Sequence, residues 1–77
     1  MAPDRKRLDD ALLAAHAAND LDRLCGLYTQ AADLSEQEAD VDAACFFLTQ
    51  AYVFALQAGR SEADGLHKRL LAYGRDE

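Results

Sequence analysis

The chain has 77 residues, of which 51% are hydrophobic, and its formal net charge is −6. This length allows one domain with a single core, and the hydrophobic share argues against a disordered chain. Two cysteines are too few for a disulfide scaffold. Alanine is abundant, isoleucine is absent and only two valines occur, so the composition favours helices over a β-sandwich.

The negative charge is concentrated in one segment. Residues 20–42 contain seven acids and one base, which accounts for the whole imbalance. Such a surface repels phosphate backbones and anionic membranes. We therefore expect no nucleic acid and no membrane as a partner, and the longest uninterrupted hydrophobic stretch, Ala43–Leu48, is too short to cross a bilayer. The basic start of the chain lacks the apolar run of a signal peptide, so we expect a cytoplasmic protein with reduced thiols.

The first two predicted helices cover residues 4–18 and 21–37. Asn19 and Asp20 separate them, and Asp20 suits the N-cap of the second helix. Gly26 interrupts the second helix and indicates either a close helix contact or an exposed position of no structural role. Apolar residues recur at helical spacing on one face of each helix: Leu8, Ala11, Leu12, Ala15 and Ala18, then Leu21, Leu24, Cys25, Tyr28, Ala31 and Ala32.

The third predicted helix covers residues 41–58, and its start has two alternatives. Ser35 and Glu38 match a capping box, whereas Asp40 suits an N-cap; we favour a turn at residues 38–40. This helix is apolar around most of its circumference, which predicts burial on several sides at the centre of the molecule. Its two apolar stripes are Val41, Ala44, Cys45, Leu48, Ala51, Tyr52, Ala55 and Leu56, and Phe47 with Phe54, beside Phe46 and Val53.

The fourth predicted helix covers residues 61–73. Gly59 ends the third helix, Ser61 suits the N-cap of the fourth, and Gly74 closes it. Its inner face comprises Ala63, Leu66, His67, Leu70 and Tyr73. Links this short make consecutive helices antiparallel neighbours. The predicted fold is all-α, a single domain over residues 1–77 with four antiparallel helices and the third helix central.

Part of the pattern resembles the tetratricopeptide repeat. Leu24, Leu27, Tyr28 and Ala31 have the spacing of positions in the first helix of a repeat, and Ala44, Leu48 and Ala51 that of the second. Residues 70–77 resemble the end of another first helix and its turn. The resemblance covers about residues 21–77 and implies helical hairpins that bind protein partners. A small up-and-down bundle is the alternative architecture.

We expect no enzyme, because no nucleophile has an evident base. Cys25 and Cys45 fall on inward stripes without basic neighbours, and a hairpin turning near residue 39 puts them at opposite ends. His16 is expected to be solvated and His67 partly buried and hydrogen-bonded. The spacing of these four residues fits no zinc site, so we expect no metal and no other cofactor. The acids suit helix starts and a solvated surface.

The leading hypothesis for function is a small helical module that binds a protein or peptide. The large apolar residues exceed what three neighbouring helices bury, and an acidic rim favours a basic partner. The alternative is a helical homodimer that buries the same aromatics across a two-fold axis and has no other ligand. The candidate interaction surface comprises Phe46, Phe47, Phe54, Asp33, Glu36 and Asp40.

Overall fold

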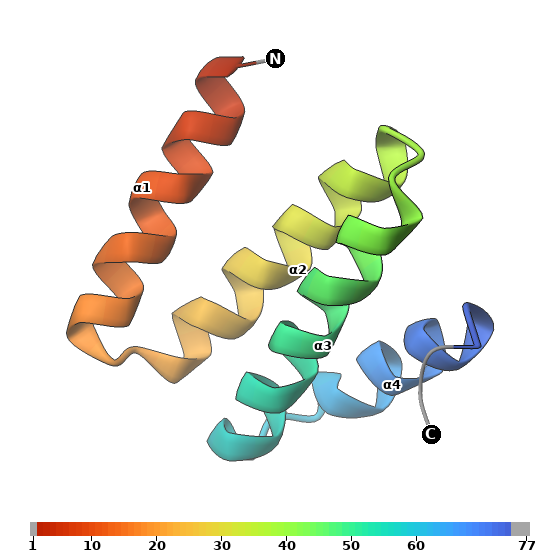
Figure 1. Cartoon of the computed structure of the whole chain (residues 1–77). Coiled ribbons are helices and arrows are strands. Elements are labelled where there is room, and N and C mark those ends of the chain that lie inside the picture. The colour runs from red at the N-terminus through yellow and green to blue at the C-terminus, as the bar shows by residue number, and fades with distance from the viewer. Residues whose placement is uncertain (1, 75–77) are drawn as a thin grey trace.

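The computed structural model describes residues 2–74, with side chains from residue 6 onward, and the regular structure of this range is helical (Figure 1). The helices are α1 (Ala2–Ala18), α2 (Leu21–Gln37), α3 (Val41–Ala58) and α4 (Glu62–Ala72). The predicted all-α fold is confirmed, and α3 is central because it packs against both α2 and α4. The predicted helix ends agree with the observed ones within two residues. Residues 75–77, part of the resemblance above, lie outside the described range.

Each described helix is followed by a residue with a left-handed backbone. The φ angles at these stops lie between 55° and 70°. Glycine adopts this conformation without cost and asparagine tolerates it, whereas alanine is strained there. The stops after α1, α2, α3 and α4 are Asn19, Ala39, Gly59 and Gly74.

Aspartates begin the two long inner helices. The carboxylate of Asp20 accepts a hydrogen bond from the backbone N–H of Arg23 at 3.2 Å, and Asp40 accepts one from Ala43 at 3.1 Å. The favoured start of the third helix is therefore correct. The alternative start at Ser35 is wrong, because Ser35 is buried within α2.

The predicted capping role of Ser61 is wrong. Its hydroxyl makes no capping hydrogen bond, and its backbone already has helical angles (φ −67°, ψ −20°). An N-cap side chain reaches the first-turn N–H groups from a backbone outside the helical region. The start of α4 is held instead by Arg60, which pairs with Glu62 and with Asp22 of α2 (Nη1–Oδ1 3.2 Å).

The core lies between α2 and α3 and is closed on one side by α4. Leu24 and Leu48 are its largest fully buried apolar side chains. Small residues line much of the contact, which lets the two helix backbones approach closely. Ala63, Leu66 and Leu70 cover the core from α4. The fully buried alanines are Ala32, Ala44, Ala51 and Ala55.

Helix α1 is the least integrated part of the described chain. It packs against α2, meets it at the Asn19–Asp20 link, and diverges from it toward the N-terminus (Figure 1). Among its described side chains, only Leu8 and Ala15 are buried, and Ala18, which the pattern placed on the inner face, is exposed. The outer side of α2 next to α1 is therefore left partly open.

Taken as a whole, α3 has the length and hydropathy of a membrane-spanning helix, with a mean hydropathy of 1.3 over its 18 residues. The stretch Ala43–Leu48 alone underestimated the apolar length of the helix, because the apolar sequence resumes after Thr49 and Gln50. A core helix of a small bundle passes the same test. The packing of α3 between α2 and α4 buries one side of the helix, 28% of its residues, and leaves Phe46, Val53 and Leu56 exposed.

Candidate functional site

The structure does not bring the six predicted surface residues together. Phe47 and Phe54 are half-buried against the core, whereas Phe46, beside Phe47 in sequence, is 58% exposed. Consecutive residues on a helix point about 100° apart, so neighbouring phenylalanines take different environments. Asp33 and Glu36 lie on the side of α2 that faces α4, and Asp40 is the N-cap of α3.

Phe47 and Phe54 belong to an aromatic cluster that joins three helices. Tyr28 of α2 stacks on Phe54 (ring centroids 5.7 Å apart) and on Phe47 (6.1 Å). His16 of α1 meets the edge of Phe54 at 6.0 Å, and its Nε2 is 2.9 Å from the Tyr28 hydroxyl. The exposed His16 is thus partnered rather than merely solvated. We infer that this aromatic cluster (His16, Tyr28, Phe47 and Phe54) holds α1 against the α2–α3 hairpin.

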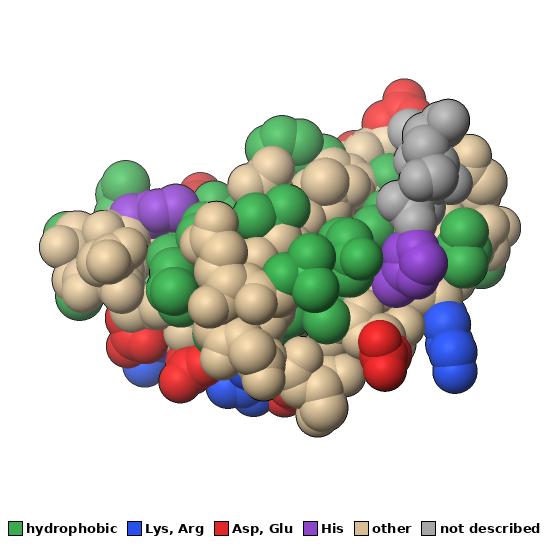
Figure 2. All heavy atoms as spheres, turned by 90° about the horizontal axis from the view of Figure 1, so that it is seen from below, with side chains coloured by type: hydrophobic (Ala, Val, Ile, Leu, Met, Phe, Trp, Pro, Cys, Tyr) green, Lys and Arg blue, Asp and Glu red, His purple; other side chains and the backbone are tan. Residues whose placement is uncertain are grey.

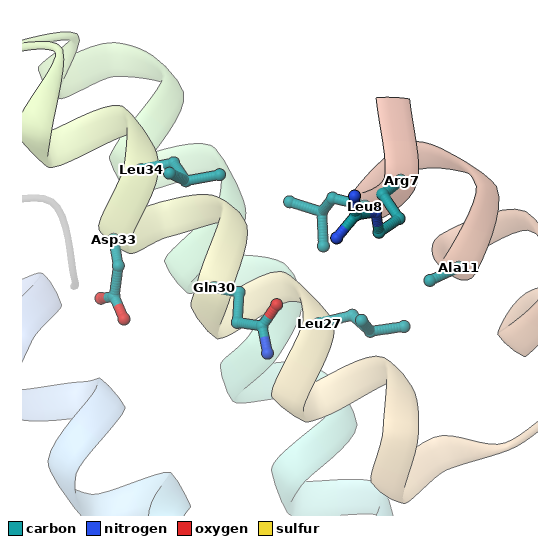
Figure 3. A pocket seen from close by; sticks show the side chains of 7 residues that line it. All are labelled: Arg7, Leu8, Ala11, Leu27, Gln30, Asp33 and Leu34. Carbon is teal, nitrogen blue, oxygen red and sulfur yellow. The ribbon is translucent and has the colours of Figure 1, made fainter. Parts of the chain in front are cut away.

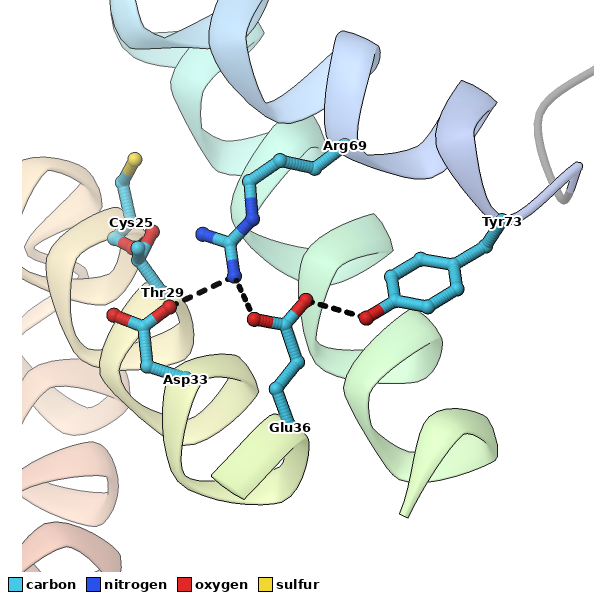
Figure 4. A network of polar contacts seen from close by, with 6 residues as sticks. All are labelled: Cys25, Thr29, Asp33, Glu36, Arg69 and Tyr73. Atoms are coloured by element: carbon cyan, nitrogen blue, oxygen red, sulfur yellow. Dashed lines mark hydrogen bonds and ion pairs between the residues drawn. The ribbon is translucent and has the colours of Figure 1, made fainter. Parts of the chain in front are cut away.

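The carboxylates of Asp33 and Glu36 are engaged within the chain. Arg69 of α4 donates to Asp33 Oδ1 at 2.8 Å and to Glu36 Oε1 at 2.9 Å, and the Tyr73 hydroxyl donates to Glu36 Oε2 at 2.6 Å (Figure 4). The hydrogen bond from Tyr73, followed by the charge of Arg69, lowers the pKa of Glu36. This network ties α4 to α2 and partly neutralises the acidic rim expected to attract a basic partner.

An open groove lies between α1 and α2. Its volume is about 450 Å³, and its apolar walls are Leu8 and Ala11 of α1 and Leu27 and Leu34 of α2. Figure 3 shows the side chains of Leu27 and Leu34 pointing toward α1 and that of Leu8 pointing toward α2. Polar side chains stand at the rim. The seven lining residues of this α1–α2 groove are Arg7, Leu8, Ala11, Leu27, Gln30, Asp33 and Leu34.

The groove exists because the two helices diverge while both remain apolar on the facing sides. Leu27 and Leu34 are seven residues apart, two turns along α2, and both are only half-buried. On α1, Ala14 and Ala18 continue the line of Arg7 and Ala11 at helical spacing, and both are exposed. Of this line, Arg7 and Ala11 belong to the groove lining. The sequence signal was Leu27, which flanked the apolar stripe, but the angle between α1 and α2 could not be read from it.

The two cysteines lie in the interior, and the two histidines contact aromatic side chains. Cys25 and Cys45 are buried and are not joined in a disulfide. Burial raises the pKa of the Cys25 thiol, which opposes formation of a nucleophilic thiolate. His67 stacks on Tyr52 with ring centroids 5.4 Å apart. Among the described side chains, no group of three or more His, Cys, Asp or Glu residues is placed to hold a metal ion.

Hydrophobic and charged side chains gather in different places on the side of the molecule that contains the α1–α2 and α3–α4 links. Figure 2 shows hydrophobic side chains across the middle of this face, between the two histidines, with most of the acidic and basic side chains along the lower edge and some acidic ones at the upper edge.

Comparisons with known proteins add no relative to this description. No protein-family model matches the chain, and neither a curated protein nor a solved structure shows significant similarity to it.

Proposed function

We propose that this chain is a small helical protein-interaction module that binds an amphipathic helix of a protein partner in the α1–α2 groove. The observation that carries the proposal is the groove itself, an open apolar trough between two helices. An amphipathic helix buries its apolar face in such a trough through residues at helical spacing. Leu27 and Leu34, two turns apart, offer contacts at matching intervals.

The chemistry of the groove defines the partner further. Its floor is apolar, so the occupant needs an apolar stripe. The α1 wall carries the exposed Arg7, and the α2 wall carries Asp33, which already contacts Arg69. We therefore expect an acidic residue of the partner beside Arg7, where opposite charge fixes the direction of the bound helix. The net charge of the chain favoured a basic partner, but the charges at the groove do not favour a strongly basic one.

The tetratricopeptide resemblance is part of the same proposal. Modules of that type bind partners on faces made by consecutive helices. A partner helix in the groove would add a layer to α1 and α2 in the way that consecutive hairpins stack. The proposal depends on the groove alone, so it holds equally for a small bundle.

The test uses a displayed library of amphipathic helical peptides, selected on the full chain and measured by fluorescence anisotropy. Leu27→Glu puts a charge in the floor of the groove, and we expect it to weaken binding about tenfold or more. Leu13→Glu is the matched control, because Leu13 is 70% exposed on α1 and does not line the groove. Circular dichroism checks that both variants keep the wild-type helix content.

Two results would contradict the proposal. The library could yield no peptide that binds the wild-type chain, or the selected peptides could bind Leu27→Glu as well as they bind Leu13→Glu. In the second case the binding face lies elsewhere on the molecule.

A further inference from the structure

The outer side of α3 carries exposed apolar residues that no helix of the described chain covers. Phe46 is 58% exposed, Val53 40% and Leu56 56%. They lie opposite the buried side of α3, which contains Ala44, Leu48, Ala51 and Ala55. With Thr49, which is also exposed, they form the outer seam of α3: Phe46, Thr49, Val53 and Leu56.

The spacing of this seam is that of a coiled coil. Its residues follow one another at steps of three, four and three, so they keep to one side of the helix over three turns. The buried side of α3 already packs within the molecule. The seam therefore gives α3 a second apolar side, of the kind that pairs with another helix.

The seam is also free of charge. Residues 43–58 contain no Asp, Glu, Lys or Arg, and glutamines at positions 50 and 57 lie beside the apolar residues. A charged partner has no opposite charge to meet on this surface, and the acidic chain as a whole repels anionic bilayers. The surface best suited to it is one equally apolar and uncharged.

We propose that the outer seam of α3 pairs with the outer seam of a second copy of this chain, the two helices running antiparallel about a two-fold axis. In this register Phe46 lies opposite Leu56 of the second copy, and Thr49 lies opposite Val53. The bulkiest residue thus meets a flexible aliphatic side chain, and the small Thr49 leaves room for a β-branched one. Two-fold symmetry repeats each contact, so the seam of each copy is covered by the identical seam of the other copy.

The proposal is independent of the α1–α2 groove, because the two surfaces share no residue. The interface is short, and a short interface gives a weak dimer, with a Kd on the order of micromolar. Both copies carry a net charge of −6, so their mutual repulsion opposes association. Salt screens this repulsion and leaves apolar contacts in place. We expect the dimer to strengthen as salt is added.

Sedimentation velocity over a range of protein concentrations tests the pairing. We expect the wild type to pass from monomer to dimer, and Val53→Glu to raise the Kd about tenfold or more, since each dimer would bury the new charge twice. Leu13→Glu adds the same charge on α1 and is the matched control, expected to dimerise like the wild type. A wild-type chain that stays monomeric at its highest soluble concentration, or equal dimerisation of the two variants, overturns the proposal.

A double variant tests the antiparallel register. Thr49→Lys combined with Val53→Glu places opposite charges in one layer of the antiparallel pair, and we expect it to recover part of the dimerisation lost in Val53→Glu. Parallel helices would put like charges opposite each other, so no recovery overturns the register. Flotation with phosphatidylcholine vesicles identifies the competing occupant: a monomer that binds vesicles through Val53 assigns the seam to a bilayer and overturns the dimer.

Discussion

At the scale of single residues, several side chains have a role that their local chemistry fixes. Glu36 is the clearest, because it receives hydrogen bonds from both Arg69 and Tyr73 (Figure 4). The lowered pKa of Glu36 means that its ionised form is favoured in the folded chain. The stability that it contributes is present above its ordinary pKa of 4.5 and is lost as the pH falls through its lower folded value.

Tyr73→Phe tests this assignment. Loss of the hydroxyl removes the largest cause of the shift, so we expect the pKa of Glu36 to rise toward 4.5, with a smaller loss of stability in acid. The pKa is measured by NMR titration of the Glu36 side chain. Tyr52→Phe is the control, because Tyr52 stacks on His67 rather than bonding to Glu36. An unchanged Glu36 pKa in Tyr73→Phe would show that the hydrogen bond contributes nothing.

Two glycines should respond oppositely to alanine. Gly26 is exposed inside α2, and a Cβ added there meets no atom within 4 Å, which removes the helix-contact interpretation. We expect Gly26→Ala to stabilise the fold by about 1 kcal/mol. Gly59 has open space too, but its φ of 68° strains any other residue, so Gly59→Ala should destabilise by about 1 kcal/mol. Urea unfolding measures both, and the same sign for the two would contradict this reading.

At the scale of helices, the starts of α2 and α3 depend on aspartate caps and the start of α4 does not. We expect Asp20→Ala and Asp40→Ala each to cost about 1 kcal/mol in the free energy of unfolding. Ser61→Ala should cost less than about 0.5 kcal/mol, because its hydroxyl caps nothing. Thermal and urea unfolding of the three variants provide the measurement. A Ser61 effect as large as that of Asp40 would restore the predicted cap.

The helices were predictable from the sequence because their ends are local events. Asp40 caps within three residues, and Gly59 stops α3 by its own backbone angle. The rotation of each helix about its own axis was harder to predict from the sequence. Phe46 and Phe47 are chemically identical neighbours, and the position of the other helices, including Tyr28 of α2, decides which of them is enclosed. The predicted N-cap at Ser61 was wrong because its backbone is already helical. The residue type favours a cap, but the backbone angles decide whether the hydroxyl can reach the first-turn N–H groups.

At the scale of the molecule, the candidate surface was the least predictable feature. The expected surface combined leftover apolar residues with an acidic rim. Asp33 and Glu36 contact α4 instead, whereas Phe47 and Phe54 pack with aromatic residues of α1 and α2. The α1–α2 groove arises from an angle between helices, which no periodicity encodes. Long-range ion pairs such as Arg69 with Asp33, 36 residues apart, were likewise hidden from the sequence.

The uneven packing predicts uneven stability. Helix α1 contacts α2 and buries little, whereas α2 and α3 enclose the core. We expect the backbone amides of α1 to exchange with solvent through local opening, at a lower free energy than those in the middle of α3. Hydrogen exchange followed by NMR measures this directly. Equal protection of α1 and α3 would show that the chain opens as one unit, and α1 would then be an integral part of the core.

The hydropathy of α3 has a consequence during synthesis. As it leaves the ribosome, α3 is an 18-residue helix with a mean hydropathy of 1.3, which by length and composition alone is enough to cross a membrane. Translation takes about a second or more to add that many residues, while a local helical pair closes in milliseconds or less. Since α2 precedes α3 in the chain, its packing partner is already outside the tunnel. Rapid closure of this pair buries the inner side of α3 before the next helix is complete, whereas its outer seam stays exposed.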